Sequence, residues 1–402
     1  MTSRALLVVG GGSNQCGLIR AGKKFATTVI VSDINVNPPG RQFADIFASI
    51  DTRDKEANLA LARRHDVSAV VTDQTDAAVP TCAYVAESLG LPGIGYELAL
   101  RFTNKFVMRR ILEDKLGDCI PEFSYFDHPS EADEWLTQLD SVSDWIVKPH
   151  TSQGSKGVAR LSVEKHKTQL WDAFRASNFV GILLERYIVG EEYSVEAFVE
   201  QGDVHNLAVT VKEHYPENPC IDVRNLYLGG VSPSLEEDMF ALNTRVIKSL
   251  GLTQGPTHAE YMATPDGKIF LIEIAARGGG GNISEKLVPY LTGFSPTQGI
   301  LNTATGVSND MTYQNYKDRC AIMRFVDLPH GQYGPVHLSD LSEEYLLHLD
   351  LDLDREFESR PVRDSTDRLG YFVVKGDAPE QALERESRIM RQIIDAAARA
   401  RK

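Results

Sequence analysis

The chain has 402 residues, of which 24% are charged and 42% hydrophobic, as is typical of a soluble globular protein with two or three domains. Its 56 acidic and 42 basic residues give a net charge of −14, which argues against nucleic acid or an anionic membrane as the main partner. The five cysteines form no CxxC pair, and neither a signal peptide nor an 18-residue apolar run is present, so we expect a cytoplasmic protein without a disulfide framework, zinc site or membrane span.

The first hundred residues alternate between strand-like and helix-like patterns. Continuous apolar runs, typical of parallel strands buried on both faces, occupy 5–9, 29–32 and 69–72. Helical periodicity covers 56–65 and 77–89. This alternation predicts a doubly wound α/β domain over residues 1–97.

A glycine turn, Gly10–Gly12, follows the first predicted strand. It is not the dinucleotide-binding fingerprint, because Gln15 stands where that pattern has its third glycine, and the Lys-Ser/Thr pair of a P-loop is missing. A dinucleotide oxidoreductase is therefore disfavoured. A substrate contact from this turn stays open, because strand ends in such sheets face a ligand crevice.

Two lysines and a glycine loop follow in the next segment. Thr103 is predicted to cap a helix that carries Lys105 and Arg109. Lys148 ends a short predicted strand just before a proline, so its side chain should be held near the sheet. The loop Ser152–Gly157 could close its backbone N–H groups over phosphates, with Lys156 adding charge. The alternative is an ordinary hairpin tip, and Lys148 shifts the balance toward phosphate binding.

Two glutamates, Glu185 and Glu192, bracket a turn between predicted strands at 182–184 and 193–199. Backbone groups of such a turn can bind an adenine edge, and a carboxylate can accept hydrogen bonds from ribose hydroxyls. A solvated turn with charged flanks is the alternative. Residues 212–234, rich in Pro, Gly and Asn, are predicted to be a long functional or mobile loop.

A hairpin is predicted around the turn Asp266-Gly267, after an amphipathic helix that ends at Gly251. With the turn centred there, Glu260 stands directly opposite Glu273, which is expected to share a covered face with Ile269 and Leu271. Two facing carboxylates repel each other, and a hard cation such as Mg²⁺ would satisfy both. A loop one residue longer or shorter would break the pairing.

Arg277 follows this hairpin and precedes four glycines, which would let backbone approach a ligand closely. A fixed guanidinium beside a metal site suits binding of phosphate or carboxylate. The remaining residues, 311–402, are predicted to add strands near 321–326 and 370–374 and a final helix from Pro379.

Taken together, six short motifs resemble the ATP-grasp superfamily over about residues 1–310. In the family's order, they are N104-K105, I146-V147-K148-P149, S152-Q153-G154-S155-K156-G157-V158, E185-R186-Y187-I188-V189-G190-E191-E192-Y193-S194-V195-E196, H258-A259-E260-Y261 and E273-I274-A275-A276-R277. The resemblance implies an α/β and α+β protein, in which an N-terminal doubly wound pre-ATP-grasp domain precedes a two-part ATP-grasp fold. The implied division is 1–97 for the pre-ATP-grasp domain, 98–187 for a small lid subdomain, 188–310 for a large subdomain, and 311–402 for a C-terminal subdomain that completes the substrate site.

The resemblance also implies a role for each matching residue. Phosphates would be bound by Lys105, Lys148 and the closing loop with Ser152, Gly154, Ser155, Lys156 and Gly157. Adenine and ribose would be held by Glu185, Tyr187, Ile188 and Glu192. The metal ligands would be Glu260 and Glu273. Arg277 and Lys148 would act in catalysis. Substrate contacts would come from His258, Gly278, Gly279 and Asn282. Many members carry Asn where this chain has Ala275, so the number of metal ions is open, with Asn282 as a candidate replacement.

The stretch E-I-A-A-R-G-G-G-G and the tail G-Y-F-V-V-K-G-D-A-P are most similar to L-amino-acid ligases and related carboxylate–amine ligases. This implies ATP and Mg²⁺ (or Mn²⁺) as cofactors, and an ADP-forming reaction in which an amine, such as an amino acid, attacks an acyl phosphate to give an amide or dipeptide. The implied partners are a small carboxylate and a small amine, and a homodimer is a further expectation. The alternatives are a purine-pathway type of ligase acting on a phosphoribosyl amine, for which no extra basic pocket is legible, and an ATP-binding module without ligase activity.

Overall fold

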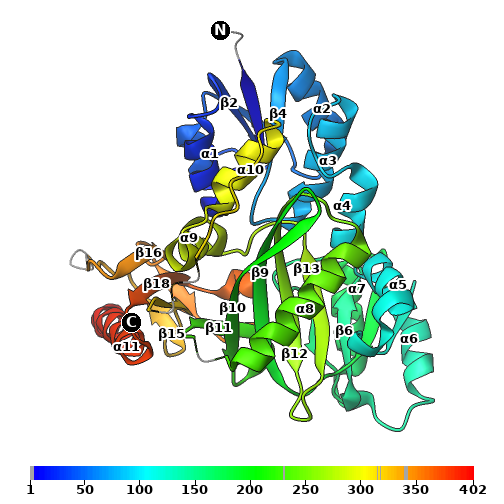
Figure 1. Ribbon diagram of the computed structural model, residues 1–402. Helices are drawn as coiled ribbons and strands as arrows, with labels where there is room; N and C mark the ends of the chain where they lie inside the picture. Colours follow the sequence, from blue (N-terminus) through cyan, green and yellow to red (C-terminus); the bar gives the residue numbers. More distant parts are fainter. Residues whose placement is uncertain (1–3, 230, 315, 317, 339–342) are drawn as a thin grey trace.

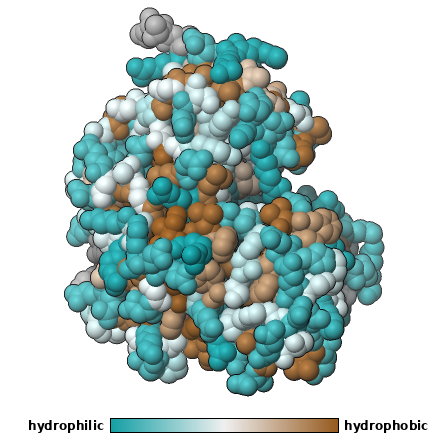
Figure 2. All heavy atoms as spheres, turned by 90° about the vertical axis from the view of Figure 1, so that its right-hand side faces the viewer, coloured by the Kyte–Doolittle hydropathy of each residue, from teal (hydrophilic) through white to brown (hydrophobic). Residues whose placement is uncertain are grey.

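The computed structural model describes residues 4–229, 231–314, 316, 318–338 and 343–402. The described residues form three larger sheets and one two-stranded sheet. In Figure 1 the parallel sheet lies at the top, the large sheet in the middle and the small antiparallel sheet at the lower right. The N-terminus lies at the top, and the C-terminal helix α11 (Pro379–Ala400) lies at the lower left. Figure 2 shows a mostly hydrophilic face on which hydrophobic residues gather near the middle. Within the described residues, no helix is both long and apolar enough to cross a membrane.

The N-terminal sheet is parallel, with the strand order β3-β2-β1-β4. Its strands are β1 (Ala5–Val9), β2 (Thr28–Asp33), β3 (Ile46–Ser49) and β4 (Val67–Val71). Alternate residues of β1 face opposite layers: Leu7 packs toward α2 and α3, and Leu6 packs toward α1 and α10. These helices are α1 (Cys16–Gly22), α2 (Lys55–Arg64), α3 (Val79–Ser88) and α10 (Pro296–Ala304).

Helices cover both faces of this sheet, so the doubly wound domain that the apolar runs predicted is confirmed. Two of its elements, β3 and α1, were not predicted. β3 is only four residues long and half-buried, and α1 begins directly after the glycine turn, so neither has a strong periodic signal. α10 is contributed by a segment that begins 225 positions after the end of β4, and it lies across the parallel sheet in Figure 1.

Asn104, and not Thr103, caps the helix that carries Lys105. Thr103 is the last residue of α4 (Tyr96–Thr103), and the chain turns extended at Asn104, whose side chain accepts a 3.0 Å hydrogen bond from the backbone N–H of Val107. α5 (Lys105–Leu116) starts at the next residue. An Asn cap satisfies an N–H that has no partner in the first turn, and it sets the direction in which Lys105 leaves the helix.

The small sheet is antiparallel in the order β5-β8-β6-β7 and is covered by two helices. Its elements are β5 (Phe123–Phe126), α6 (Pro129–Leu136), β6 (Trp145–Pro149), β7 (Ala159–Arg160), α7 (His166–Ala176) and β8 (Ile182–Arg186). The glycine loop joins β6 to β7, so the predicted strand–loop–strand order is confirmed.

The large sheet has eight strands in the order β13-β12-β9-β10-β11-β14-β18-β16. Their bounds are β9 (Glu191–Glu200), β10 (Asp203–Tyr215), β11 (Asn218–Tyr227), β12 (Gly255–Ala263), β13 (Ile269–Ala275), β14 (Cys320–Phe325), β16 (Leu346–Leu351) and β18 (Gly370–Gly376). α8 (Pro233–Leu250) covers one part of the sheet and α11 another, while β15 (Gly331–Tyr333) pairs with β17 (Phe357–Ser359). One sheet therefore runs continuously from the hairpin through the C-terminal strands.

The long loop predicted over 212–234 is wrong. β10 continues to Tyr215, and β11 occupies most of the rest, paired with β10 on one side and with β14 on the other. The prolines that suggested a loop lie at the turn and at the start of β11, where a missing N–H does not break the ladder. Ile221, Val223 and Tyr227 fall on the buried phase of a two-residue repeat, which is a strand signal.

Candidate active site

The hairpin of β12 and β13 places its two glutamates opposite each other, as predicted, but by a different route. The pairs next to the turn are offset by one residue from the predicted register, because Ala263 pairs with Ile269. A β-bulge restores the register: Tyr261 pairs with Leu271, whereas Glu260 pairs with Glu273, so Ile272 is the extra residue. The bulge, and not the turn alone, therefore places Glu260 opposite Glu273.

This bulge also corrects the face on which Glu273 lies. Leu271 and Ile274 pack into the core beneath α8, while Ile272 and Glu273 both line the cavity on the other side of the sheet. Glu273 therefore does not share a covered face with Ile269 and Leu271. The extra residue shifts the alternation by one position, and it points the second carboxylate into the cavity, where its side chain keeps 36% of its exposure.

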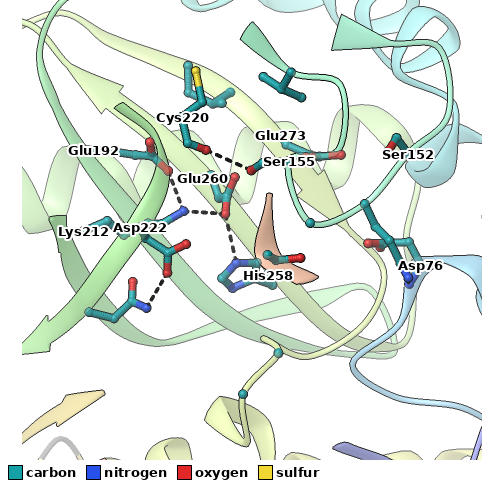
Figure 3. Close-up of a pocket in the computed structure, with 18 of the residues that line it drawn as sticks. Asp76, Ser152, Ser155, Glu192, Lys212, Cys220, Asp222, His258, Glu260 and Glu273 are labelled. Atoms are coloured by element: carbon teal, nitrogen blue, oxygen red, sulfur yellow. Dashed lines mark hydrogen bonds and ion pairs between the residues drawn. The ribbon is translucent and has the colours of Figure 1, made fainter. Parts of the chain in front are cut away.

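Each carboxylate of the pair is held by a lysine ammonium. Lys105 Nζ lies 2.5 Å from Glu273 Oε1, and Lys212 Nζ lies 2.7 Å from Glu260 Oε1 and 2.6 Å from Glu192 Oε1. Figure 3 shows Lys212 between Glu192 and Glu260, with His258 on the other side of Glu260. Burial works to raise the pKa of Glu260, but Lys212 and His258 hold that pKa well below its ordinary value, so the carboxylate is ionised.

Glu185 forms a buried ion-pair cluster with Arg109 and Lys148. Its two oxygens accept from Arg109 Nε at 2.7 Å and from Lys148 Nζ at 2.6 Å, and only 1% of the Glu185 side chain is exposed. Arg109 also donates to the carbonyl of Ile272 in the bulge at 2.6 Å. Burial alone would raise the pKa of Glu185, but the charges of Arg109 and Lys148 lower it to about 2. Glu185 thus fixes Lys148 beside the cavity, and Arg109 links α5 to the bulge.

Arg277 leaves the end of β13 and is held by an acid from the N-terminal lobe. Its Nη2 and Nε atoms lie 2.8 and 3.1 Å from the two carboxylate oxygens of Asp76, and its Nη1 donates to the carbonyl of Gly278 at 3.1 Å. Burial alone would lower the pKa of Arg277, but the negative charge of Asp76 outweighs this effect. The pKa of Arg277 is therefore raised above its ordinary value, and the guanidinium keeps its charge. A two-point pair of this kind fixes the plane of the guanidinium.

The glycine loop is closed over the cavity and contacts three different segments through three consecutive residues. Gln153 Oε1 accepts from the backbone N–H of Asp76 at 3.1 Å, the carbonyl of Gly154 accepts from Ser365 N at 3.1 Å, and Ser155 Oγ donates to the carbonyl of Cys220 at 2.9 Å. Gly154 has φ +65°, and a Cβ there would lie 2.2 Å from Ser365 Oγ. The closed position therefore requires glycine at residue 154.

These groups surround one cavity of about 510 Å³. The predicted residues that line it are Lys105, Lys148, Ser152, Gly154, Ser155, Glu185, Tyr187, Ile188, Glu192, His258, Glu260, Glu273 and Arg277. Ser13 and Asn14, directly after the glycine turn of the N-terminal domain, line it as well. All three sheets thus contribute to the same cavity.

Five predicted residues lie outside this lining: Lys156, Gly157, Gly278, Gly279 and Asn282. Asn282 donates to the hydroxyl of Tyr371 at 2.6 Å, and its backbone N–H donates to Gln74. Gly278 N donates to Asp73 and Gly279 N to Glu196. These two hydrogen bonds attach the start of the glycine run to the N-terminal domain and to β9. The later glycines, Gly280 and Gly281, line the cavity instead.

Sequence reasoning missed several residues that the fold brings to the cavity. Lys212 is among them because the prolines, glycines and asparagines of 212–234 predict a loop, whereas Lys212 lies in β10 directly after Val211. Asp76, Asp222 and Arg368 were also missed. Arg368 pairs with Asp222, and its guanidinium carbon lies 3.5 Å from the ring centre of Phe325.

The donor set suits a magnesium ion bound together with phosphates. Mg²⁺ is usually held by one or two protein carboxylates with the remaining positions taken by water and phosphate oxygens, and Glu260 and Glu273 supply two carboxylates on one face. Within the described part of the chain, no group of three or more His, Cys, Asp or Glu side chains is arranged to hold a metal alone. The pair therefore fits a metal that arrives with a nucleotide better than a resident ion.

Comparison with known proteins agrees with this geometry. A family model of the ATP-grasp domain matches residues 142–286. Dapdiamide A synthase from Enterobacter agglomerans is 27% identical over 194 residues, a match that spans 46% of this chain and 45% of that protein, so about half of that relative lies outside it. Phosphoribosylamine–glycine ligase from Methanocorpusculum labreanum is 24% identical over 361 residues, 81% of this chain and 80% of that protein.

The fold matches solved structures over its whole length. The L-amino acid ligase from Bacillus licheniformis superposes with a TM-score of 0.81 at 20% identity and covers 98% of both chains. Phosphoribosylglycinamide synthetase from Anaerococcus prevotii superposes with a TM-score of 0.74 at 19% identity over 97% of this chain and 98% of that one. Residues 142–286 thus form an ATP-grasp domain, and the chain as a whole shares its fold with these solved ligase structures.

Proposed function

We propose that this protein is an ADP-forming carboxylate–amine ligase that activates a small carboxylate with ATP and joins it to an amine, giving an amide or a dipeptide. The observation that carries the proposal is the meeting of the Glu260–Glu273 pair with Lys105, Lys148 and Arg277 in one cavity under a closed glycine loop. Two acids that suit a metal, surrounded by three cations, match the charge needs of phosphoryl transfer.

The two lysines and Arg277 would neutralise charge on the transferring phosphoryl group as the substrate carboxylate attacks it. Lys148 is fixed by Glu185, and Lys105 leaves the first turn of a capped helix, so both ammonium groups are positioned before ATP arrives. Glu260 and Glu273 would hold Mg²⁺, which would supply further positive charge beside the phosphates. The carboxylate then carries the phosphoryl group as an acyl phosphate, and ADP is the leaving group.

An amine would next attack the carbonyl carbon of the acyl phosphate and expel inorganic phosphate. Water competes with the amine at this step, so a cover over the cavity is a chemical need. Gln153, Gly154 and Ser155 supply that cover by their contacts with three segments. Opening of the loop would break at least four hydrogen bonds, each of modest net strength, so substrate entry and product release remain feasible.

The direct test is ATP-dependent phosphate release with free amino acids and small carboxylates offered in pairs, and products identified by mass. We expect release that requires two partners and yields their amide. Release with a carboxylate alone would indicate acyl phosphate formation without the right amine. Tight Mg-ATP binding without release under any pair would contradict the ligase assignment and favour a binding module.

Replacing Lys148 with alanine should weaken ATP binding by about ten- to a hundredfold, because one fixed cation next to the phosphates is lost. The fold should persist, since Glu185 keeps its two-point pair with Arg109. Calorimetric titration with Mg-ATP measures the change. Lys115→Ala, which removes an ammonium group from the exposed end of the neighbouring helix α5, serves as the control. Equal affinity of the Lys148→Ala and Lys115→Ala proteins would count against a phosphate contact.

A ligase acting on a phosphoribosyl amine is the second candidate, favoured by the match to phosphoribosylamine–glycine ligase over four-fifths of both chains. Such a substrate carries its own phosphate and requires a cation for it. The arginines of the described cavity lining are each paired with an aspartate: Arg186 with Asp144, Arg277 with Asp76 and Arg368 with Asp222. For this reason we place amino-acid substrates first, and including phosphoribosylamine in the substrate pairs distinguishes the two.

A further inference from the structure

We propose that Asp76 is a positioning residue, which holds Arg277 in its working orientation and ties that orientation to the closed state of the glycine loop. The inference rests on the proposed function, because it assigns Asp76 a part in the same phosphoryl transfer. It concerns a residue of the N-terminal lobe, 201 positions before Arg277 in the chain.

The carboxylate of Asp76 fixes Arg277 more firmly than a single contact would. Asp76 begins a short 3-10 turn after β4, at the carboxyl end of the parallel sheet, and both of its oxygens accept from Arg277. With the bond to the Gly278 carbonyl, three of the five guanidinium N–H groups are occupied. The other two have no partner among the described residues and belong to a side chain that lines the cavity.

The backbone of Asp76 forms a hydrogen bond with the glycine loop. Gln153 accepts from the N–H of Asp76 at 3.1 Å and from the hydroxyl of Thr75 at 3.4 Å. One residue thus holds the catalytic guanidinium by its side chain and the closed loop by its main chain. When the loop closes, the contact between Gln153 and the backbone of Asp76 restrains Asp76 further. Because Asp76 also binds Arg277, this contact restricts the movement of the guanidinium as well.

A neighbouring contact offers a matched control. Ser284 Oγ donates to Asp73 at 2.7 Å and joins the same two segments of chain without touching Arg277. If Asp76 merely fastened the N-terminal lobe to the large sheet, the loss of Ser284 should resemble the loss of Asp76. If Asp76 positions Arg277, only its own loss should affect the chemistry.

The variants Asp76→Asn, Asp76→Glu and Ser284→Ala separate these two roles. We expect Asp76→Asn to lower kcat about ten- to a hundredfold with the Kd for Mg-ATP within about twofold of wild type, since a misplaced catalytic group costs rate more than nucleotide binding. Asp76→Glu keeps the carboxylate and should recover part of the rate. Ser284→Ala should stay within about threefold of wild type.

A second readout needs no substrate. Phenylglyoxal labels arginine side chains, and peptide mass spectrometry follows Arg277 in the free protein. We expect labelling of Arg277 to speed up about threefold or more in Asp76→Asn and to stay unchanged in Ser284→Ala, because only the first frees the guanidinium. Unchanged labelling in Asp76→Asn, or equal losses of kcat in Asp76→Asn and Ser284→Ala, would overturn the proposal. Failure of the wild-type protein to form an amide would instead refute the proposed function, and the labelling result would still decide the role of Asp76.

Discussion

Replacing Glu273 with glutamine is expected to lower the rate of ATP-dependent phosphate release by at least about a thousandfold, because the variant loses one of the two carboxylates that we propose as metal ligands. Glutamine has the same size and can still accept a hydrogen bond from Lys105, so the hairpin should keep its register. The Mg²⁺ concentration needed for half-maximal nucleotide binding should rise at the same time, and titration calorimetry in the presence of a non-hydrolysable ATP analogue measures it.

The control for this experiment is Asp266→Asn at the tip of the same hairpin, where the side chain is 63% exposed and outside the cavity. It removes one negative charge from the same element and should leave the rate near wild type. Wild-type phosphate release from Glu273→Gln would contradict the metal assignment. A slow Glu273→Gln enzyme with an unchanged Mg²⁺ requirement would instead assign the loss to the pairing of Glu273 with Lys105.

Replacing Glu185 with glutamine should destabilise the protein by about 3–5 kcal/mol, because it leaves the buried cations of Arg109 and Lys148 without their shared anion. Urea unfolding, followed by circular dichroism, measures the change in the free energy of unfolding for the part of the protein that contains the small sheet. Glu134→Gln, on an exposed position of α6, is the matched control and should change stability little. An equally stable Glu185→Gln protein would show that the cluster contributes no net stability.

The pH dependence provides an independent check on this cluster. The folded pKa of Glu185 is about 2, below the ordinary glutamate value of about 4.3, so its contribution is present above about pH 4.3 and is lost as the pH falls through 2. The difference corresponds to about 3 kcal/mol, in line with the cost of the substitution. We therefore expect the wild-type and Glu185→Gln proteins to differ most in stability above pH 4.5 and to converge at lower pH.

Local rules predicted the elements well wherever the chain obeys one period. The apolar runs of the first domain, the helix that ends at Gly251 and the two predicted C-terminal strands, β14 and β18, lie where the pattern places them, whereas β15, β16 and β17 were not predicted. The rules failed where a single residue changes the period. Residues 212–234 combine prolines with a strand, and Ile272 inserts a bulge that no propensity indicates, so the face of Glu273 was predicted wrongly although its partner was right.

The candidate site was legible where its residues share an element or a motif, and hidden where docking brings them together. Lys148 and the glycine loop follow one strand, and Glu260 and Glu273 belong to one hairpin. The pairs Arg109–Glu185 and Asp76–Arg277 join residues 76 and 201 positions apart. Their contact depends on how whole lobes pack, and this arises from buried apolar surface with no local sequence signal.

The position of α10 has a consequence for the inheritance of this chain as modules. The helix follows the acidic hairpin in sequence, yet Ile300 and Leu301 complete the apolar layer over Leu6 and Val8 of the first sheet. A fragment that stops near residue 97 would lack α10 and would expose this apolar layer to water. An N-terminal domain taken from another protein would have to pack against an α10 whose side chains fit the original sheet. Exchange of the first lobe between relatives therefore requires recombination at two points, so the two stretches are expected to diverge in concert.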